Sequence, residues 1–351
     1  MRALVLHGID DLRLEDMPVP EPGPGEVLIQ VVACGVCGSD IPRIFTKGAH
    51  RYPLICGHEF SGLVTECGEG VDDLEKGAHV TAFPLLWCGK CPSCERGRYA
   101  QCLDYDYLGS RCHGAFAEYV KVPRRNVLRV PEGVSMEVAA MAEPAAVALH
   151  ALRRAGGLSA GEVVAVFGAG PVGLMVAQWA EISGAGKVIL FDVAPDKCAL
   201  ARQLGFRYCF NASETLTREV VDNLTDGLGV DIAIDAAGVP DTLTGCLEAA
   251  GIGGRVVLLG NPSADVLMPA SLLSQTMRRE ISIVGSWNSV YSASGNRDEW
   301  QVVLQSMAAS ALLLNPLISH RVTLAHAPGM LRTVYEKTQT TMKVIIQPIL
   351  G

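Results

Sequence analysis

Four cysteines lie close together at positions 88–102, and their spacing constrains the fold more than any other feature of the sequence. The pattern is C-x2-C-x2-C-x7-C, formed by Cys88, Cys91, Cys94 and Cys102. Four thiolates on one short segment match the tetrahedral ligand set of a structural zinc ion with no open position. An iron–sulfur cluster or a group of reactive thiols is the alternative, but nothing else in the sequence indicates electron transfer. We therefore expect a lobe that a zinc ion stabilises.

The region before residue 125 differs in composition from the region that follows it. The chain has 351 residues, more than one hydrophobic core usually supports, so we expect two domains. Up to residue 125, short β-branched runs alternate with glycine and proline, which is typical of an antiparallel, barrel-like domain. These runs lie at 27–33, 62–68, 79–83 and 116–122.

Between residues 147 and 286, the expected strands and helices alternate. This alternation predicts a doubly wound parallel sheet. The final apolar run, at 343–350, is more similar to the strands of the first region, so we expect the chain to return there. The sequence therefore predicts an α/β fold with one domain at 1–147 and 287–351 and a second domain at 148–286.

A glycine-rich turn follows the first strand of the second region. The strand expected at 163–167 leads directly into Gly168, Gly170, Pro171, Val172 and Gly173. In such a turn the first glycine permits the tight bend, the second lets a pyrophosphate approach, and the third allows close packing of helix on strand. The following helix then offers unpaired N–H groups to the phosphates. We expect a dinucleotide to bind here.

Asp192 indicates which dinucleotide binds. It ends the next expected strand, where a carboxylate accepts hydrogen bonds from the adenosine ribose and repels a 2′-phosphate. Val193 follows it, where an arginine would favour the phosphorylated cofactor. The alternative role for Asp192 is to cap the helix expected from residue 196. The sequence predicts NAD rather than NADP.

A thiol, an imidazole and two carboxylates form a second candidate metal site. Cys37 precedes a glycine, His58 and Glu59 follow Gly57, and Glu143 lies far downstream. A thiolate, an imidazole and a carboxylate with one open position are typical ligands of a catalytic zinc. Each residue alone has an ordinary structural explanation, but their combination with a nicotinamide site favours catalysis. Whether Glu59 or Glu143 binds the metal stays open.

The segment between these candidate ligands is basic. No acid occurs between Asp40 and Glu59, although the protein has a formal net charge of −8. Its cationic residues are Arg43, Lys47, His50 and Arg51. They predict recognition of an anion such as phosphate, unless the segment is an ordinary solvated loop. Trp287 and Asn288 are further candidate substrate residues, with a place in the core as the alternative for the tryptophan.

The overall composition disfavours two classes of partner. An acidic net charge argues against nucleic acid and anionic membranes as partners. The longest apolar stretch, at 138–152, is interrupted by charged and polar residues, and acids occur where a signal peptide needs an apolar run. We expect a cytoplasmic protein that acts on a small molecule.

Taken together, these motifs resemble the zinc-containing medium-chain dehydrogenase family. The matching segments are GHEFSGLVTECGEGV at 57–71, the four-cysteine lobe, the GAGPVG turn and EPAAVALHAL at 143–152. They follow the family's order along essentially the whole chain. The resemblance implies a GroES-like catalytic domain split around a Rossmann domain, NAD and two zinc ions per chain, and a homodimer or homotetramer.

Within the family, the chain resembles the polyol branch, because Glu143 stands where the alcohol branch has a cysteine ligand. Segments 37–62, 109–119 and 285–300 are similar to members that oxidise galactitol 1-phosphate to tagatose 6-phosphate. The resemblance implies that zinc lowers the pKa of a secondary hydroxyl, that Ser39 takes its proton and that hydride passes to NAD. Pro42 stands where sorbitol-type members have a histidine, which weakens the usual histidine relay.

Two other interpretations stay open. An unphosphorylated polyol or L-threonine is an alternative substrate within the same family. A different class, a dinucleotide-binding protein without a catalytic metal, is expected to lack one of the three candidate ligands Cys37, His58 and Glu143, and the sequence contains them all.

Metal analysis of the purified protein separates the last interpretation from the enzyme. The enzyme predicts about two zinc ions per chain, because one closed and one open ligand set are expected. About one zinc ion per chain, without NAD-linked turnover, would instead support the protein that has no catalytic metal.

Overall fold

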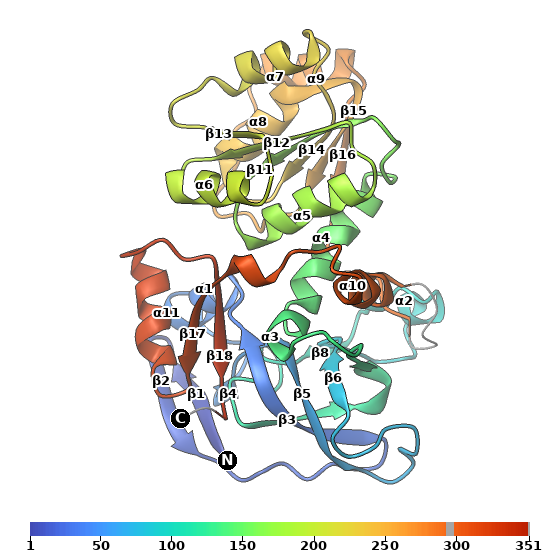
Figure 1. Ribbon diagram of the computed structural model, residues 1–351, viewed down its shortest axis with the longest axis vertical. Helices are drawn as coiled ribbons and strands as arrows, with labels where there is room; N and C mark the ends of the chain where they lie inside the picture. Colours follow the sequence, from blue (N-terminus) through green and yellow to red (C-terminus); the bar gives the residue numbers. More distant parts are fainter. Residues whose placement is uncertain (293–297, 350–351) are drawn as a thin grey trace. The chain divides into compact units, whose positions relative to one another are not determined.

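The computed structural model describes residues 1–292 and 298–349 (Figure 1). It divides into two compact units, one formed by Met1–Pro144 with Val290–Gly351 and the other by Ala145–Ser289. The sequence placed the boundaries after residue 147 and before residue 287. Helix α4 (Ala142–Arg154) runs through the first observed boundary, so no change of sequence pattern marks it. Parts of the segments 285–300 and 343–350 lie outside the described residues.

The first unit is built mainly on antiparallel strands. A seven-stranded sheet has the order β10-β6-β5-β3-β18-β17, with β9 also paired to β3, and two smaller sheets have the orders β2-β1-β4 and β7-β8. The strands are β1 (Arg2–Gly8), β2 (Asp11–Asp16), β3 (Glu26–Gly35), β4 (Leu54–Ile55), β5 (Glu59–Cys67), β6 (His79–Ala82), β7 (Leu85–Trp87), β8 (Tyr105–Tyr107), β9 (Tyr119–Pro123), β10 (Val127–Arg129), β17 (Ile318–Thr323) and β18 (Lys343–Gln347). The α-helices are α1 (Asp40–Phe45), α2 (Pro92–Glu95), α3 (Met136–Ala139), α10 (Glu299–Ala308) and α11 (Ala327–Glu336).

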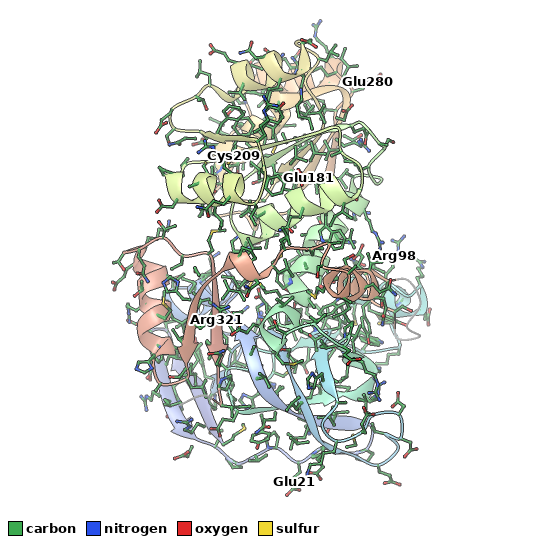
Figure 2. All side chains as sticks on the ribbon, in the orientation of Figure 1. Glu21, Arg98, Glu181, Cys209, Glu280 and Arg321 are labelled. Carbon is green, nitrogen blue, oxygen red and sulfur yellow. The ribbon has the colours of Figure 1, made fainter. Side chains whose placement is uncertain are left out.

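The tail of the chain returns to the first unit, as expected from its apolar pattern. Strand β18 pairs antiparallel with β3, with Ile345 opposite Gly35. Arg321 on β17, labelled in Figure 2, donates to both carboxylate oxygens of Glu137 on α3 at 2.8–2.9 Å. Gln347 donates to the same carboxylate at 2.8 Å. One acid near the start of α3 therefore holds both C-terminal strands.

The second unit is a parallel sheet with helices on both faces, as predicted. The strand order is β13-β12-β11-β14-β15-β16, and every neighbouring pair is parallel. Figure 1 shows α5 and α6 on one face of the sheet and α7, α8 and α9 on the other. The strands are β11 (Val163–Phe167), β12 (Lys187–Asp192), β13 (Tyr208–Asn211), β14 (Val230–Asp235), β15 (Ala250–Leu258) and β16 (Ser282–Gly285). The helices besides α4 are α5 (Pro171–Ile182), α6 (Pro195–Gln203), α7 (Thr217–Thr225), α8 (Pro240–Ala249) and α9 (Ala270–Arg278).

Each unit has its own hydrophobic core. In the first unit, apolar side chains of β1, β3 and β5 pack with Phe116 and with residues of α11. In the second, strands β11, β12 and β14 bury continuous apolar runs between the two helical layers, including Phe167 and Phe191, which stack at 5.0 Å. Charged side chains such as Glu21 and Glu280 lie on the surface (Figure 2). Among the described residues, no helix is both long and apolar enough to span a membrane.

The edge strand β16 gives a prediction about self-association. It pairs with β15 alone within the described sheet, and Ile283 on it is 45% exposed. We expect two copies to pair along this edge, so Ile283→Lys should shift the protein toward the monomer, because lysine discourages edge pairing. Light scattering after size exclusion measures the mass, with Ile252→Lys, also at an exposed apolar position, as the control. A mass that Ile283→Lys leaves unchanged would contradict the prediction.

Candidate functional site

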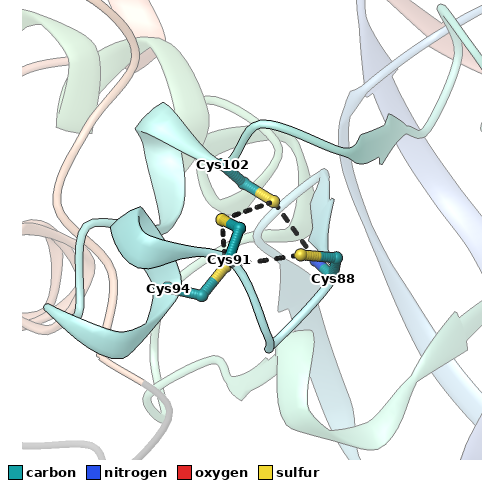
Figure 3. A group of neighbouring side chains, drawn as sticks. All are labelled: Cys88, Cys91, Cys94 and Cys102. Carbon is teal, nitrogen blue, oxygen red and sulfur yellow. Dashed lines mark hydrogen bonds between the residues drawn. The ribbon is translucent and has the colours of Figure 1, made fainter.

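The four cysteines of the lobe converge in the structure (Figure 3). The Sγ–Sγ distances are 3.5 Å between Cys91 and Cys94, 3.9 Å between Cys91 and Cys102, and 4.0 Å between Cys88 and Cys94. A tetrahedral zinc with Zn–S bonds of about 2.3 Å needs sulfur atoms about 3.8 Å apart. The four sulfurs therefore fit a closed structural zinc site.

Local hydrogen bonds and ring contacts support this lobe. Backbone N–H groups, that of Leu103 above all, lower the pKa of Cys91 to about 6, which favours the thiolate that a metal binds. The Trp87 ring, just before the first cysteine, stacks on Tyr99 at 4.4 Å. On the same ring the Arg125 guanidinium lies 4.3 Å from the centroid, and it donates to the Trp87 carbonyl at 2.6 Å.

Strand pairing brings the second group of candidate ligands together. Cys37 lies two residues beyond the end of β3, and Glu59 begins β5, which pairs with β3 so that Gly35 lies opposite Glu59. Ligand atoms of Cys37, His58 and Glu59 all lie within 4.8 Å of one another. A side chain at Gly35 would collide with the Glu59 carboxylate, so close approach requires glycine there. These three residues could hold a metal after a small convergence.

Glu143 lies in the same pocket but outside that group of three. It belongs to the first turn of α4, and its side chain is buried. The Tyr107 hydroxyl donates to its Oε1 at 3.2 Å, and the Tyr107 ring packs edge-on against the His58 imidazole at 5.6 Å. Burial raises the pKa of Glu143 to about 7.

Asp40 organises the other side of the pocket. Its side chain is completely buried, and Oδ2 accepts from the Cys37 backbone N–H at 3.0 Å. Oδ1 accepts from Arg43 at 2.6 Å and lies 3.7 Å from Nδ1 of His58. Arg43 also donates to Ser110 at 3.2 Å. This guanidinium is occupied within the pocket wall, which does not favour its predicted contact with a substrate phosphate.

The electrostatics around His58 suit a cation. Burial disfavours the charged imidazolium, but the negative charges of Asp40 and Cys37 outweigh it and raise the pKa of His58 to about 10. The Nδ1 atom is buried without a hydrogen-bond partner among the described residues. A metal ion would supply the positive charge that a proton on this imidazole otherwise supplies. The donor set therefore fits a divalent metal.

Lys343 pairs with Glu59 from the last strand of the chain. Its Nζ donates to Oε2 of Glu59 at 2.6 Å and to the Val36 carbonyl at 3.1 Å. Both side chains are almost fully buried. Sequence reasoning gave Asp40, Tyr107 and Lys343 no role in this pocket. Of the three, only Asp40 lies close in sequence to a predicted ligand, three residues after Cys37.

Apart from Asn288, the remaining predicted substrate residues lie at the surface of their units. Lys47, His50 and Arg51 are exposed on the loop after α1, within the first unit. Ser39 directly precedes α1, and its exposed side chain makes no capping hydrogen bond. In the second unit Trp287 is 57% exposed, so it is not a core tryptophan, whereas Asn288 is buried.

The glycine-rich turn has the geometry that a dinucleotide requires. Gly168 has φ +107°, which favours glycine, and a side chain at Gly173 would collide with the Gly168 carbonyl. In contrast, a Cβ at Gly170 would meet no atom, so open space adjoins the N-terminus of α5 at this residue. Pro171 then begins the helix, with Val172 next in its first turn. The turn leaves room for a phosphate at the helix N-terminus.

Asp192 lies at the end of β12, beside this turn. Its carboxylate accepts from the Ala169 N–H at 2.7 Å and from the Ala194 N–H at 2.8 Å. Nζ of Lys197 lies 3.7 Å from Oδ2. Val193, which follows Asp192, is exposed.

Two protein families match the chain. The Alcohol dehydrogenase GroES-like domain matches residues 23–132, and the Zinc-binding dehydrogenase family matches residues 171–309. Galactitol 1-phosphate 5-dehydrogenase of Escherichia coli K12 is 38% identical over 322 residues, 92% of each chain. The crystal structure of galactitol-1-phosphate dehydrogenase from Escherichia coli superimposes with a TM-score of 0.93 and 36% identity, over 99% of this chain and 100% of that one.

Relatives with other names are nearly as similar. A sorbitol dehydrogenase of Bacillus subtilis is 36% identical over 76% of each chain. An L-threonine 3-dehydrogenase of Pyrococcus abyssi is 35% identical over 88% of this chain and 87% of its own. Such similarity determines the family and not the substrate.

Metal binding at the Cys37 group should tighten as the pH rises. Because the pKa of His58 in the metal-free protein is about 10, the imidazole is protonated at neutral pH, and a metal must displace that proton. With the lobe loaded, zinc affinity measured by chelator competition should rise at least about tenfold per pH unit between about pH 6.5 and about pH 8.5. Asp40→Asn should make this slope shallower, because it removes the largest favourable charge on the imidazolium. A wild-type affinity independent of pH would contradict the account.

Proposed function

Since this chain belongs to the zinc-binding medium-chain dehydrogenases, we propose that it transfers hydride to NAD from a secondary hydroxyl of a phosphorylated polyol. The substrate we propose is galactitol 1-phosphate, and the product is tagatose 6-phosphate. Membership of the family confirms the resemblance seen in the sequence, together with the α/β fold of a Rossmann sheet and a GroES-like domain. The chain is an oxidoreductase that acts on a small molecule.

The observation that carries the phosphate part of this proposal is the exposed basic loop next to the metal ligands. Helix α1 starts three residues after Cys37 and leads into Lys47, His50 and Arg51. These cations lie between Cys37 and His58 in the sequence of an acidic protein, and none of them has a partner carboxylate among the described ion pairs. The likeness to the Escherichia coli enzyme supports the same substrate.

The residues of the first unit have distinct roles in the proposed reaction. Cys37, His58 and a carboxylate, Glu59 or Glu143, hold the metal. A zinc ion there supplies Lewis-acid polarisation of the substrate hydroxyl. Ser39, exposed at the start of α1, accepts the hydroxyl proton and passes it to water.

In the second unit, the GAGPVG turn and Asp192 bind the cofactor. The turn receives the pyrophosphate at the N-terminus of α5, and the Asp192 carboxylate receives the adenosine ribose. NAD held by these residues would supply the hydride acceptor for the oxidation of the carbinol carbon to a ketone. Trp287 and Asn288 are proposed substrate contacts of this unit. We further propose a cytoplasmic location and a homodimer or homotetramer.

A substrate panel with NAD tests the proposal. On protein with a measured metal content, kcat/KM should be at least about tenfold higher for galactitol 1-phosphate than for galactitol, because a charge-assisted phosphate contact is lost with the free polyol. A preference for free sorbitol or for L-threonine would overturn the proposed substrate and leave the family intact.

Variants of the basic loop test phosphate recognition more directly. Lys47→Ala and Arg51→Ala should each raise KM for the phosphate ester by about tenfold and leave KM for a neutral polyol unchanged. Lys76→Ala, which removes an equally exposed cation, is the matched control. Arg43→Ala is unsuitable here because it leaves Asp40 buried without its cation. Equal effects on charged and neutral substrates would exclude the loop as a phosphate site.

A further inference from the structure

We propose that Tyr107 is a positioning residue for the catalytic metal site, and that the four-cysteine lobe holds it in place. Through its hydroxyl Tyr107 orients the Glu143 carboxylate, and through the β7–β8 hairpin it is joined to the lobe. The metal of the lobe then strengthens metal binding at the Cys37 group. This inference rests on the proposed metal site and adds a coupling between the two sites.

Tyr107 contacts both sides of the metal pocket. Its hydroxyl donates to Oε1 of Glu143 at 3.2 Å, which leaves Oε2 free for another partner. The ring packs edge-on against the imidazole of His58, with an interplanar angle of 73°. A carboxylate held by one oxygen and an imidazole held on one face lose rotational freedom before a metal arrives. Such hydrogen bonds to ligands orient them and strengthen metal binding.

The lobe provides the strand that carries Tyr107. Strands β7 and β8 pair antiparallel, with Leu85 opposite Tyr107 and Trp87 opposite Tyr105. Cys88 directly follows β7, and Cys102 lies three residues before β8, so a metal on these cysteines ties the two strands together at the end where the lobe connects them. The backbone N–H of Cys88 already donates to Sγ of Cys102 at 3.3 Å. Tyr107 is at the opposite end of the hairpin.

A tight turn fixes the far end of the hairpin against the pocket. The Tyr107 carbonyl accepts from three successive N–H groups, those of Ser110, Arg111 and Cys112, at 2.8–3.1 Å. Within this turn Gly109 approaches the backbone of Gly57 so closely that a side chain would collide with it. Because Gly57 precedes His58, the position of the hairpin is transmitted to a proposed ligand as well as to Glu143.

The coupling follows from this connected geometry. A metal in the lobe restrains the paired strands, the strands fix the Tyr107 ring, and the hydroxyl fixes Glu143. If the lobe metal has already fixed the Tyr107 side chain, the second metal does not have to supply the free energy of ordering it. Loss of either the hydroxyl or the lobe metal should therefore weaken the open site by a similar factor.

Tyr107→Phe tests the role of the hydroxyl, since the ring that packs on His58 is retained. With zinc buffered by a chelator, affinity at the open site should fall about tenfold, the lower end of the effect of removing a partner of a metal ligand. With the open site empty, the zinc affinity of the lobe should not change and serves as an internal reference. Tyr105→Phe, two residues away on the same strand, is the matched control and should bind zinc like the wild type. Wild-type affinity at the open site of Tyr107→Phe would overturn the inference.

A double-mutant cycle tests the role of the lobe. Cys91→Ser should weaken zinc binding at the open site about tenfold in the wild-type background and have no further effect in Tyr107→Phe. If the double variant loses as much zinc affinity at the open site as the two single variants together, the lobe does not act through Tyr107. That result would overturn the coupling. Thermal unfolding monitors the integrity of each variant.

The coupling is also measurable without altering a cysteine. Because coupling between two sites is reciprocal, filling the open site with cobalt(II) should raise the zinc affinity of the lobe in the wild-type protein by about the same factor, measured by chelator competition. The same experiment on Tyr107→Phe should leave the zinc affinity of the lobe unchanged. Equal lobe affinities with the open site empty and filled in the wild type would contradict the inference.

The failure of this inference is distinguishable from failure of the proposed function. If the wild type binds one metal per chain, in the lobe, and turns over no polyol, the proposed function fails. If the wild type binds two metals and is active while Tyr107→Phe binds zinc normally, the coupling alone fails.

Discussion

Buried negative charge is the constraint on which the metal pocket and its surroundings depend. Asp40, Glu59 and Glu143 are all buried, and Cys37 lies close to the Glu59 carboxylate. Arg43 pairs with Asp40, and Lys343 pairs with Glu59, but Glu143 receives a neutral hydroxyl. Without a metal, burial raises the pKa of Glu143 to about 7, and the nearby negative charge raises the pKa of His58 to about 10, so the pocket retains protons. A divalent metal would take the place of that positive charge, and this requirement links the fold to the chemistry.

The same constraint gives a reason for the path of the chain. Lys343 stands at the start of the last strand, and β18 pairs with β3, whose end is two residues from Cys37. The pocket is therefore complete only when the C-terminal tail has returned to the first unit. The parallel sheet of residues 145–289 is an insertion between the two halves of that unit. Without the tail, the Glu59 carboxylate would lose Lys343, its ion-pair partner.

Features set by spacing along the chain could be predicted from the sequence, and those set by distant pairing could not. The four cysteines and the GAGPVG turn are local patterns, and the structure gives both the geometry that their spacing suggests. Tyr107 and Lys343 reach the pocket through strand register, which no local pattern encodes. The ion pair of Arg43 with Asp40, one helical turn before it, could have been predicted from their spacing, but the sequence analysis assigned Arg43 to the substrate instead.

The central claim is that the Cys37 group binds a metal separate from the metal of the lobe. Anomalous X-ray scattering at the zinc absorption edge, from crystals of the zinc-loaded protein, measures this directly. The account predicts two anomalous peaks per chain, one among the four cysteines and one between Cys37, His58 and the carboxylates of Glu59 and Glu143. A single peak in the lobe, with the second pocket free of anomalous density, would contradict it.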